Sequence, residues 1–536
     1  MQELNNGKVP LKTLIANGTV VDGTGAAAFA GDVVVDGDRI ADVLPRTPPR
    51  GSFDRVIDAS GCLVTPGFID AHTHSDAYLV IEPDAPSKTT QGVTTEINGQ
   101  CGGSVAPRYG EARLSGDGAA VLGDRLTWRS LAEYRNVLGA AKPAVNTVQF
   151  VGHNTLRSSV VGYAARAATP GEVAQMKRLL EASLDEGGWG LTTGLIYQPG
   201  RYSTPDEVLA LAKVAAERGG YYATHMRSEG DRILEAIDEV LDLVRATGIR
   251  AEISHLKTSG PKNWHKIDAV LDKVECAVDD GLLLGSDRYP YCAAGTDLDV
   301  LLPDWAQEGA AKAECVRLAD AAARERIVRE IDALDRDWST VMIGGTWHAD
   351  SRQYSGRTVA EIVAAQAADG GRTSPGDTIC RILALDGCKT GAFFFGMSEE
   401  NLDKIYRRPW IVPGSDASLR APWGPLGADH PHPRAYATMP EFYRRVRALG
   451  FTREETVARM TSVPARRFGI RARGVVEKGA FADIVVWRED DFKANATYLR
   501  PHQFTGGVKC VMVNGVVPYK DGVFTGERGG RFLERA

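Results

Sequence analysis

Two histidines separated by a single residue, His72 and His74, end an apolar run that begins at Pro66. Along a β-strand, alternate side chains point to the same face, so the two imidazoles would project together. Imidazole is a good ligand for Zn²⁺, and two imidazoles on one side of a strand end make half of a metal site. For an isolated pair, a surface strand with two solvated histidines remains the alternative.

Other residues that could take part in metal chemistry also follow strand-like runs. They are Cys101, His153, His225, His255 and Asp416. In a parallel barrel the C-terminal ends of the strands converge on the one face that carries active sites. Chance placement explains one or two such positions but hardly the set, so the pattern favours a metal centre over solvated histidines.

Cys101 and Asp416 each have two interpretations at this level. Cys101 lies among glycines, where it is either a small buried hydrophobe or a thiolate ligand for zinc. Asp416 is either the N-cap of the next helix or a catalytic carboxylate. In the second role it takes a proton from the attacking water and later delivers it to the leaving nitrogen.

The two ends of the chain, residues 1–65 and 467–536, consist of short β-rich runs separated by turns. Asn17-Gly18 and Asp36-Gly37 are hairpin signals in the first of them. Neither end has enough strands to bury a core alone. We therefore expect both termini to pair into one small β-sandwich domain.

Between these ends, residues 66–466 alternate strand-like runs with helical patterns. Helices are predicted over 205–218, with Thr204 as N-cap, and over 233–247. Repeated βα units predict an α/β fold with a parallel sheet, a (β/α)₈ TIM-like barrel. The segment exceeds the roughly 250 residues of a simple barrel, so insertions are expected around 107–128 and 292–340.

The composition sets limits on partners and location. The 536 residues are 43% hydrophobic and 25% charged, with a formal net charge of −6. This charge gives no reason to expect nucleic acid or an anionic membrane as partner. No apolar run is long enough to span a bilayer, and no secretory signal is visible. Eight scattered cysteines without a C-x-x-C pair fit reduced thiols, so we expect a cytoplasmic protein.

Taken together, the motifs resemble those of the metal-dependent amidohydrolase superfamily and, within it, the D-aminoacylases (N-acyl-D-amino-acid deacylases). The resemblance covers nearly the whole chain. It includes PGFIDAHTHSD (66–76), GQCGGSVAP (99–107), ATHMRSE (223–229), EISHLKTSG (252–260), DRYPYCAAGTDL (287–298), PGSDAS (413–418) and HPRAY (432–436). The His-x-His pair marks only the superfamily, whereas Cys101 with its spacing to HMRSE and SHLK is much more specific. Hydantoinase and dihydroorotase relatives bridge two metals with a carboxylated lysine, a role that here falls to Cys101.

The resemblance implies a role for each matching residue. Cys101, His225 and His255 would hold a tightly bound Zn²⁺, whereas His72 and His74 would line a weaker metal position that shares Cys101. Asp416 would be the general base and acid. The substrate-binding residues would be Lys257, Tyr289 and Arg434 at the α-carboxylate, Tyr197 near the scissile carbonyl, and His153. Taken alone, Lys257 and Arg434 would each be read as solvated surface cations.

Three departures from the family pattern concern the substrate pocket. Asn154 follows His153 where the family usually has glycine, and Ala417 follows Asp416 where glycine is common. Arg434 lies 18 residues beyond Asp416 (416 to 434), with residues 423–428 inserted between them. The motifs of the barrel and of the metal shell are intact.

The implied activity is zinc-dependent hydrolysis of the amide bond of N-acyl-D-amino acids, which releases a carboxylic acid and a D-amino acid. Two alternatives stay open. The first is hydrolysis of another linear or cyclic amide in a specialised pathway, and the second is a catalytically inactive scaffold with the same fold. The expected partner is a small-molecule amide, and the sequence does not indicate an oligomeric state.

Overall fold

Both ends of the chain contribute strands to one nine-stranded sheet in this computed structural model, which describes residues 11–45, 52–114, 116, 118–368 and 373–535. The N-terminal strands are β1 (Lys12–Val20), β2 (Phe29–Asp36), β3 (Arg39–Pro45), β4 (Arg55–Asp58) and β5 (Leu63–Pro66). The C-terminal strands are β18 (Ile484–Trp487), β19 (Val508–Val513), β20 (Val516–Lys520) and β21 (Val523–Phe524). The two groups join where β18 pairs antiparallel with β5. One apolar core includes residues of both groups, such as Ile15 and Ile484.

The two predicted hairpins of the first segment have different outcomes. The Asp36-Gly37 prediction is confirmed, because β2 and β3 pair antiparallel across it. The Asn17-Gly18 prediction is wrong, because β1 continues through both residues. Asn17 has a positive φ of 65°, and the pairing register with β2 shifts between Ile15 and Gly18. A left-handed residue followed by glycine also suits a β-bulge, and here it bends a strand instead of ending it.

The central part of the chain forms a ring of parallel strands. In ring order they are β6 (Phe68–Asp70), β7 (Val93–Asn98), β8 (Asn146–Gln149) continued by β9 (Val151–Gly152), β10 (Gly190–Gly194), β11 (Tyr221–His225), β12 (Arg250–Ile253), β13 (Leu284–Arg288) and β17 (Ile411–Pro413). The first and last strands meet, since the Ala71 amide donates to the Pro413 carbonyl at 3.1 Å and Thr73 forms a parallel bridge with Ala417. Every loop after a strand therefore opens on one end of the ring.

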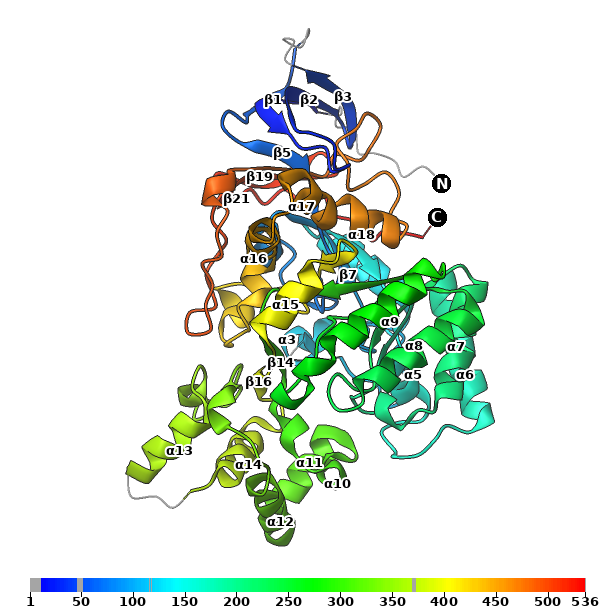
Figure 1. Cartoon of the computed structure of the whole chain (residues 1–536), viewed down its shortest axis with the longest axis vertical. Coiled ribbons are helices and arrows are strands. Elements are labelled where there is room, and N and C mark those ends of the chain that lie inside the picture. The colour runs from blue at the N-terminus through cyan, green and yellow to red at the C-terminus, as the bar shows by residue number, and fades with distance from the viewer. Residues whose placement is uncertain (1–10, 46–51, 115, 117, 369–372, 536) are drawn as a thin grey trace.

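Helices cover the outside of this ring (Figure 1). The helices between barrel strands are α5 (His153–Val160), α6 (Pro170–Asp185), α7 (Pro205–Glu217), α8 (Ile233–Thr247), α9 (Ile267–Asp279) and α15 (Glu399–Tyr406). Helices α7 and α8 confirm both helix predictions. Thr204 caps α7 as predicted, since its hydroxyl oxygen accepts from the Glu207 amide at 3.2 Å. The helices before β8 are α1 (Tyr78–Ile81), α2 (Pro86–Thr89), α3 (Gly118–Leu122) and α4 (Leu131–Ala141). The helices after β17 are α16 (Arg434–Ala448), α17 (Arg453–Met460) and α18 (Ser462–Arg467).

The largest insertion lies between β13 and β17 and extends beyond the predicted 292–340. It contains an antiparallel sheet of β14 (Ala293–Asp297), β16 (Gly391–Phe395) and β15 (Val341–Ile343). Its helices are α10 (Asp304–Gln307), α11 (Ala310–Ala319), α12 (Ala321–Asp332), α13 (Val359–Ala368) and α14 (Pro375–Asp386). This lobe has its own apolar core and lies at the bottom of Figure 1. No helix of the described residues is both long and apolar enough to cross a membrane.

Candidate metal centre

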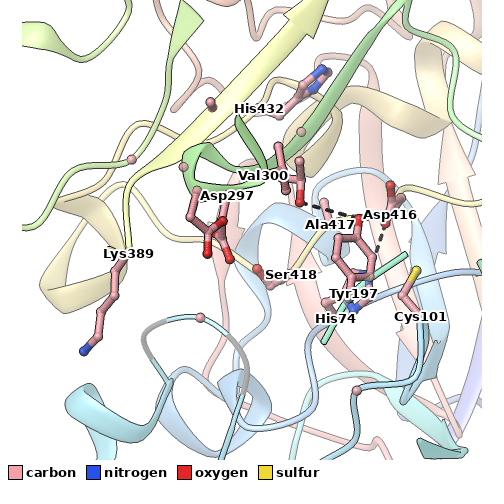
Figure 2. Close-up of a pocket in the computed structure, with 18 of the residues that line it drawn as sticks. His74, Cys101, Tyr197, Asp297, Val300, Lys389, Asp416, Ala417, Ser418 and His432 are labelled. Carbon is pink, nitrogen blue, oxygen red and sulfur yellow. Dashed lines mark hydrogen bonds and ion pairs between the residues drawn. The ribbon is translucent and has the colours of Figure 1, made fainter. Parts of the chain in front are cut away.

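The residues predicted at strand ends meet in one place. His72 and His74 follow β6, Cys101 follows β7, His225 ends β11, His255 follows β12 and Asp416 follows β17. His74, Cys101 and Asp416 line a cavity of about 510 Å³ (Figure 2), and the other three residues contact Cys101. The ring geometry brings them together because each follows a strand at the same end of the barrel.

The sulfur of Cys101 faces three imidazoles. Its Sγ lies 3.3 Å from His72 Nε2, 3.4 Å from His255 Nε2 and 3.8 Å from His225 Nδ1. Burial opposes ionisation of the thiol, but the positive charge of His72 and His255 lowers the pKa of Cys101 well below its ordinary value. A thiolate surrounded by imidazoles is a donor set that zinc prefers.

Asp416 completes this group on the side of the cavity. One carboxylate oxygen, Oδ1, lies 3.1 Å from His74 Nε2 and 3.4 Å from His72 Nε2, whereas Oδ2 accepts from Arg434 at 2.8 Å. Burial raises the pKa of Asp416, but the charges of Arg434 and His255 hold it well below its ordinary value. The carboxylate is therefore ionised and able to accept a proton.

These donors fit a divalent metal ion. One donor atom from each of His72, Cys101, His255 and Asp416 lies within 4.8 Å of the others. His225 presents its Nδ1 to Cys101 Sγ, while its Nε2 lies 3.6 Å from Glu229 Oε2. Burial opposes ionisation of His74, yet hydrogen bonds with Asp416 and Cys101 raise its pKa to about 9. The thiolate and carboxylate thus attract positive charge, which a metal dication would supply.

Three residues of the metal centre occupy left-handed backbone conformations. The φ angles are 52° at Cys101, 39° at His255 and 49° at Asp416. Such angles are uncommon outside glycine and cost free energy, and they concentrate at functional sites. Here they turn each side chain inward directly after its strand.

Several buried residues that support the centre were not predicted from the sequence. Asp287 accepts from His72 Nδ1 through Oδ2 at 3.1 Å and from the His255 amide through Oδ1 at 3.0 Å. Glu229 Oε1 lies 3.0 Å from His255 Nδ1 and pairs with Lys257. Both carboxylates stand inside quoted motifs, Asp287 in DRYPY and Glu229 four residues after His225. Their position in those motifs was the available signal.

A buried lysine holds the loop that carries Asp416. Lys88 Nζ contacts Asp70 Oδ2 and Ser415 Oγ, each at 2.9 Å. Asp70 Oδ1 in turn accepts from the Ser415 amide at 2.8 Å. The local sequence does not predict this role for Lys88, because its partner Asp70 ends the first barrel strand, β6, and its partner Ser415 follows the last one, β17.

The predicted substrate-binding residues separate into two groups. Tyr197 and Arg434 line the cavity, and the Tyr197 hydroxyl lies 3.5 Å from Thr296 Oγ1. Tyr289 is fully buried behind it, and its hydroxyl has no hydrogen-bond partner among the described residues. Lys257 is buried, and its Nζ lies 2.7 Å from His255 Nδ1. Lys257 therefore contacts the candidate ligand His255 and the neighbouring Glu229, and it is not among the residues that line the cavity.

His153 does not face the cavity. Its Nε2 lies 2.9 Å from Glu207 Oε1 on α7, and the next residue, Asn154, is the one that lines the cavity. The substrate-binding role predicted for His153 therefore has no support in this geometry, and we do not retain it. The reason is that His153 begins α5, which turns its ring toward the neighbouring helix.

The chain belongs to the amidohydrolase family, whose model matches residues 55–519. It is 34% identical to N-acyl-D-glutamate deacylase of Alcaligenes xylosoxydans xylosoxydans, over 98% of this chain and 97% of the relative. It is 33% identical to D-aminoacylase of the same organism, over 98% of each chain. These matches confirm the resemblance drawn from the motifs.

A solved structure agrees with these relatives. N-acyl-D-glutamate deacylase from Bordetella bronchiseptica, solved with zinc and a phosphonate inhibitor, superposes with a TM-score of 0.82. The two chains are 32% identical, and the match covers 98% of this chain and 100% of the other. The predicted fold, a TIM-like barrel with a small β domain, is confirmed.

Proposed function

We propose that this protein is a zinc-dependent hydrolase that cleaves the amide bond of N-acyl-D-amino acids, releasing a carboxylic acid and a D-amino acid. The observation that carries the proposal is the convergence of Cys101, four histidines and Asp416 beside one cavity. The named relatives and the zinc-containing structure support the same reading. The scattered cysteines support a cytoplasmic location.

Cys101, His225 and His255 would hold the tightly bound zinc, with His72 and His74 at a second position that shares Cys101. Bound zinc supplies Lewis acidity, which lowers the pKa of a water molecule and polarises the amide carbonyl. Glu229 orients His255 through its Nδ1, and Asp287 orients His72 through its Nδ1 and His255 through its backbone amide. Carboxylates outside the ligand set play this part in many metal sites.

Asp416 moves the proton in this proposal. Its ionised carboxylate accepts a proton from the attacking water and later donates it to the amide nitrogen as the carbon–nitrogen bond breaks. The contact with His74 and the ion pair with Arg434 fix both of its oxygens. Such fixation keeps the proton acceptor at one place relative to the substrate.

The α-carboxylate of the substrate would bind near Arg434 and Tyr289. The Arg434 Nε and the Tyr289 hydroxyl are both buried without a hydrogen-bond partner among the described residues. The Arg434 guanidinium lies 4.6 Å from the centre of the Tyr289 ring. A substrate carboxylate that reached Arg434 from the cavity would supply an acceptor for its unpaired Nε–H.

A panel of N-acetyl-D- and N-acetyl-L-amino acids on purified, zinc-quantified protein tests the proposal. We expect hydrolysis of the D series, its strong reduction in the L series, and its loss in Cys101→Ala together with zinc. Hydrolysis of neither series would leave another linear or cyclic amide as substrate. Full activity of a zinc-free preparation would overturn the mechanism, and an inert zinc-loaded protein on every amide would favour a scaffold.

A further inference from the structure

The cavity has an acidic wall opposite the metal centre. We use this name for Asp297, Asp299 and Glu314, which all line the cavity and come from the lobe inserted between β13 and β17. Figure 2 shows Asp297 across the pocket from His74, Cys101 and Asp416. Neither the metal centre nor the proposed proton transfer uses these carboxylates.

Glu314 is the most deeply placed member. Its side chain is 2% exposed, and its Oε2 atom has no hydrogen-bond partner among the described residues. The Glu314 carboxyl also hydrogen-bonds with Cys388 and Asp299. The unpartnered Oε2 atom is still costly in a buried place, so a donor that reached it would be favoured. A donor that binds this oxygen would remove the penalty of leaving it unpaired, which would strengthen the binding of that donor.

Among the described residues, no lysine or arginine forms an ion pair with the acidic wall, although the charge of Arg317 acts on Glu314 and lowers its pKa. Desolvation and then the charge of Asp299 raise the pKa of Asp297, and desolvation and then the charge of Glu314 raise that of Asp299. Arg317, the basic neighbour of Glu314, donates instead to the carbonyls of Ala306 and Glu308.

The basic residues that line the same cavity are engaged or turned elsewhere. Arg434 binds Asp416, and Arg420 lies 2.8 Å from Asp429. Lys389 and Arg113 are exposed, and Figure 2 shows the Lys389 side chain directed away from Asp297.

The spacing of the three carboxylates suits an organic cation better than a metal ion. Among the described residues, the groups of three or more donor atoms within 4.8 Å of one another lie at the metal centre. The acidic wall forms no such group, so its oxygens are too spread to enclose one metal ion. An ammonium or guanidinium has several donors that can reach separate oxygens.

Strand β14 sets the distance between the two ends of the cavity. The Gly295 carbonyl accepts from Arg434 Nη2 at 3.0 Å, so this part of β14 touches the proposed carboxylate anchor. Asp297 follows two residues later, about 7 Å farther along an extended chain. A substrate held at Arg434 would therefore reach the acidic wall with a side chain or acyl chain of several carbons.

We propose that Asp297, Asp299 and Glu314 form a subsite for a cationic group of the substrate, an ammonium or guanidinium. The cation would sit on the side chain of the D-amino acid, as in N-acyl-D-lysine, or at the far end of the acyl group. This inference rests on the proposed deacylase function. The pKa of the buried Glu314 carboxyl, raised to about 7 chiefly by burial, agrees with it, because an arriving cation would favour its charged form.

The test compares matched substrates with and without the cation. N-acetyl-D-lysine against N-acetyl-D-norleucine places the charge on the side chain, and N-(6-aminohexanoyl)-D-leucine against N-hexanoyl-D-leucine places it on the acyl group. N-acetyl-D-glutamate is the anionic comparison. We expect kcat/KM to be about tenfold higher for the cationic member of one pair, the gain of one charge-assisted hydrogen bond.

Variants of the acidic wall then link this preference to its residues. In Asp297→Asn and Asp299→Asn the ratio of cationic to neutral kcat/KM should fall about tenfold. Glu325→Gln, an exposed carboxylate on α12 of the same lobe, is the matched control and should keep the wild-type ratio. The exposed Asp297 gives a variant with little risk to folding.

Equal kcat/KM within both pairs, or the same ratio in wild type and both variants, would overturn the subsite and leave the deacylase function standing. If no substrate of either pair is hydrolysed, the deacylase function fails. Titration calorimetry with zinc-loaded protein then decides the subsite separately. Tighter binding of the cationic compound, lost in Asp299→Asn, supports it, and equal binding within each pair rejects it.

Discussion

Arg434 Nη1 donates to Asp416 Oδ2 at 2.8 Å across 18 residues of sequence. The same guanidinium donates from Nη2 to the Gly295 carbonyl at 3.0 Å. Arg434 therefore joins the proposed proton carrier to the inserted lobe that closes the substrate cavity. Because this arginine is 6% exposed, the ion pair is shielded from solvent and holds Asp416 more firmly than a surface pair would.

Arg434→Lys keeps the positive charge beside Asp416 but removes the planar guanidinium that contacts two partners at once. In Arg434→Lys we expect kcat/KM to fall about 10- to 100-fold, because lysine cannot contact Asp416 and Gly295 together. The pKa of Asp416 should also rise, which moves the acidic limb of the pH–rate profile upward. Steady-state kinetics across pH measures both effects. Arg444→Lys on the exposed side of α16 is the control, and equal losses in the two variants would argue against a role at Asp416.

Removing the proton carrier should leave the tight metal position loaded. Asp416→Asn is expected to lower kcat by about 10²- to 10⁴-fold, the usual contribution of general acid–base catalysis. Its zinc content should stay at the wild-type level, since Cys101, His225 and His255 are intact. Kinetics and elemental analysis of the same preparation check the two statements. Near-normal kcat would reject Asp416 as the base.

The histidines should differ in their effect on metal content. We expect His225→Asn to lose tightly bound zinc on dialysis and His72→Asn to retain it, whereas Cys101→Ala should lose metal at both positions. The physical reason is that three protein ligands with an open position are typical of catalytic zinc. Elemental analysis after dialysis gives the measurement, with His348→Asn, on an exposed loop, as control. The opposite order for His72 and His225 would exchange the two positions.

Glu229 is predicted to support the metal without binding it. Glu229→Gln should weaken zinc affinity about 10- to 100-fold, because the carboxylate orients His255 and pairs with Lys257. Competition with a chelator measures the affinity. The matched control is Glu239→Gln, because Glu239 lies on α8 and its carboxylate pairs with Arg227 at 3.0 Å. Unchanged chelator competition in Glu229→Gln would contradict the supporting role.

Glu314 should make folding stability fall with rising pH. Burial raises its pKa from 4.5 to about 7 in the folded protein. Between these values the folded chain keeps the proton that the unfolded chain has lost. The contribution to stability is therefore complete below pH 4.5 and disappears as pH rises to about 7.

The comparison with Glu314→Gln isolates this contribution. The Tm difference, wild type minus variant, should decrease from pH 4.5 to about 7 and level off above it, at constant zinc load. Thermal unfolding followed by fluorescence gives the values, and Glu325→Gln should show a flat difference. A flat difference for Glu314→Gln would show that this carboxyl titrates normally.

Much of the metal centre could be predicted from local pattern. The alternation of side chains along a strand determines that His72 and His74 share a face, and strand ends of a parallel barrel converge wherever they lie in sequence. Helix α7 was also predictable, because its start depends on Thr204 and Pro205 alone. Such features depend on residues a few positions apart.

Tertiary packing decided the remainder. Whether His153 turns to the cavity or to Glu207, and whether Lys257 reaches substrate or Glu229, depends on neighbours from other elements. The acidic wall likewise exists because an inserted lobe folds back over the barrel end. By itself the sequence determined which residues stand at the strand ends, since that follows from local periodicity. Only the tertiary structure decided which partner each side chain meets, since the competing partners are distant in sequence and near in space.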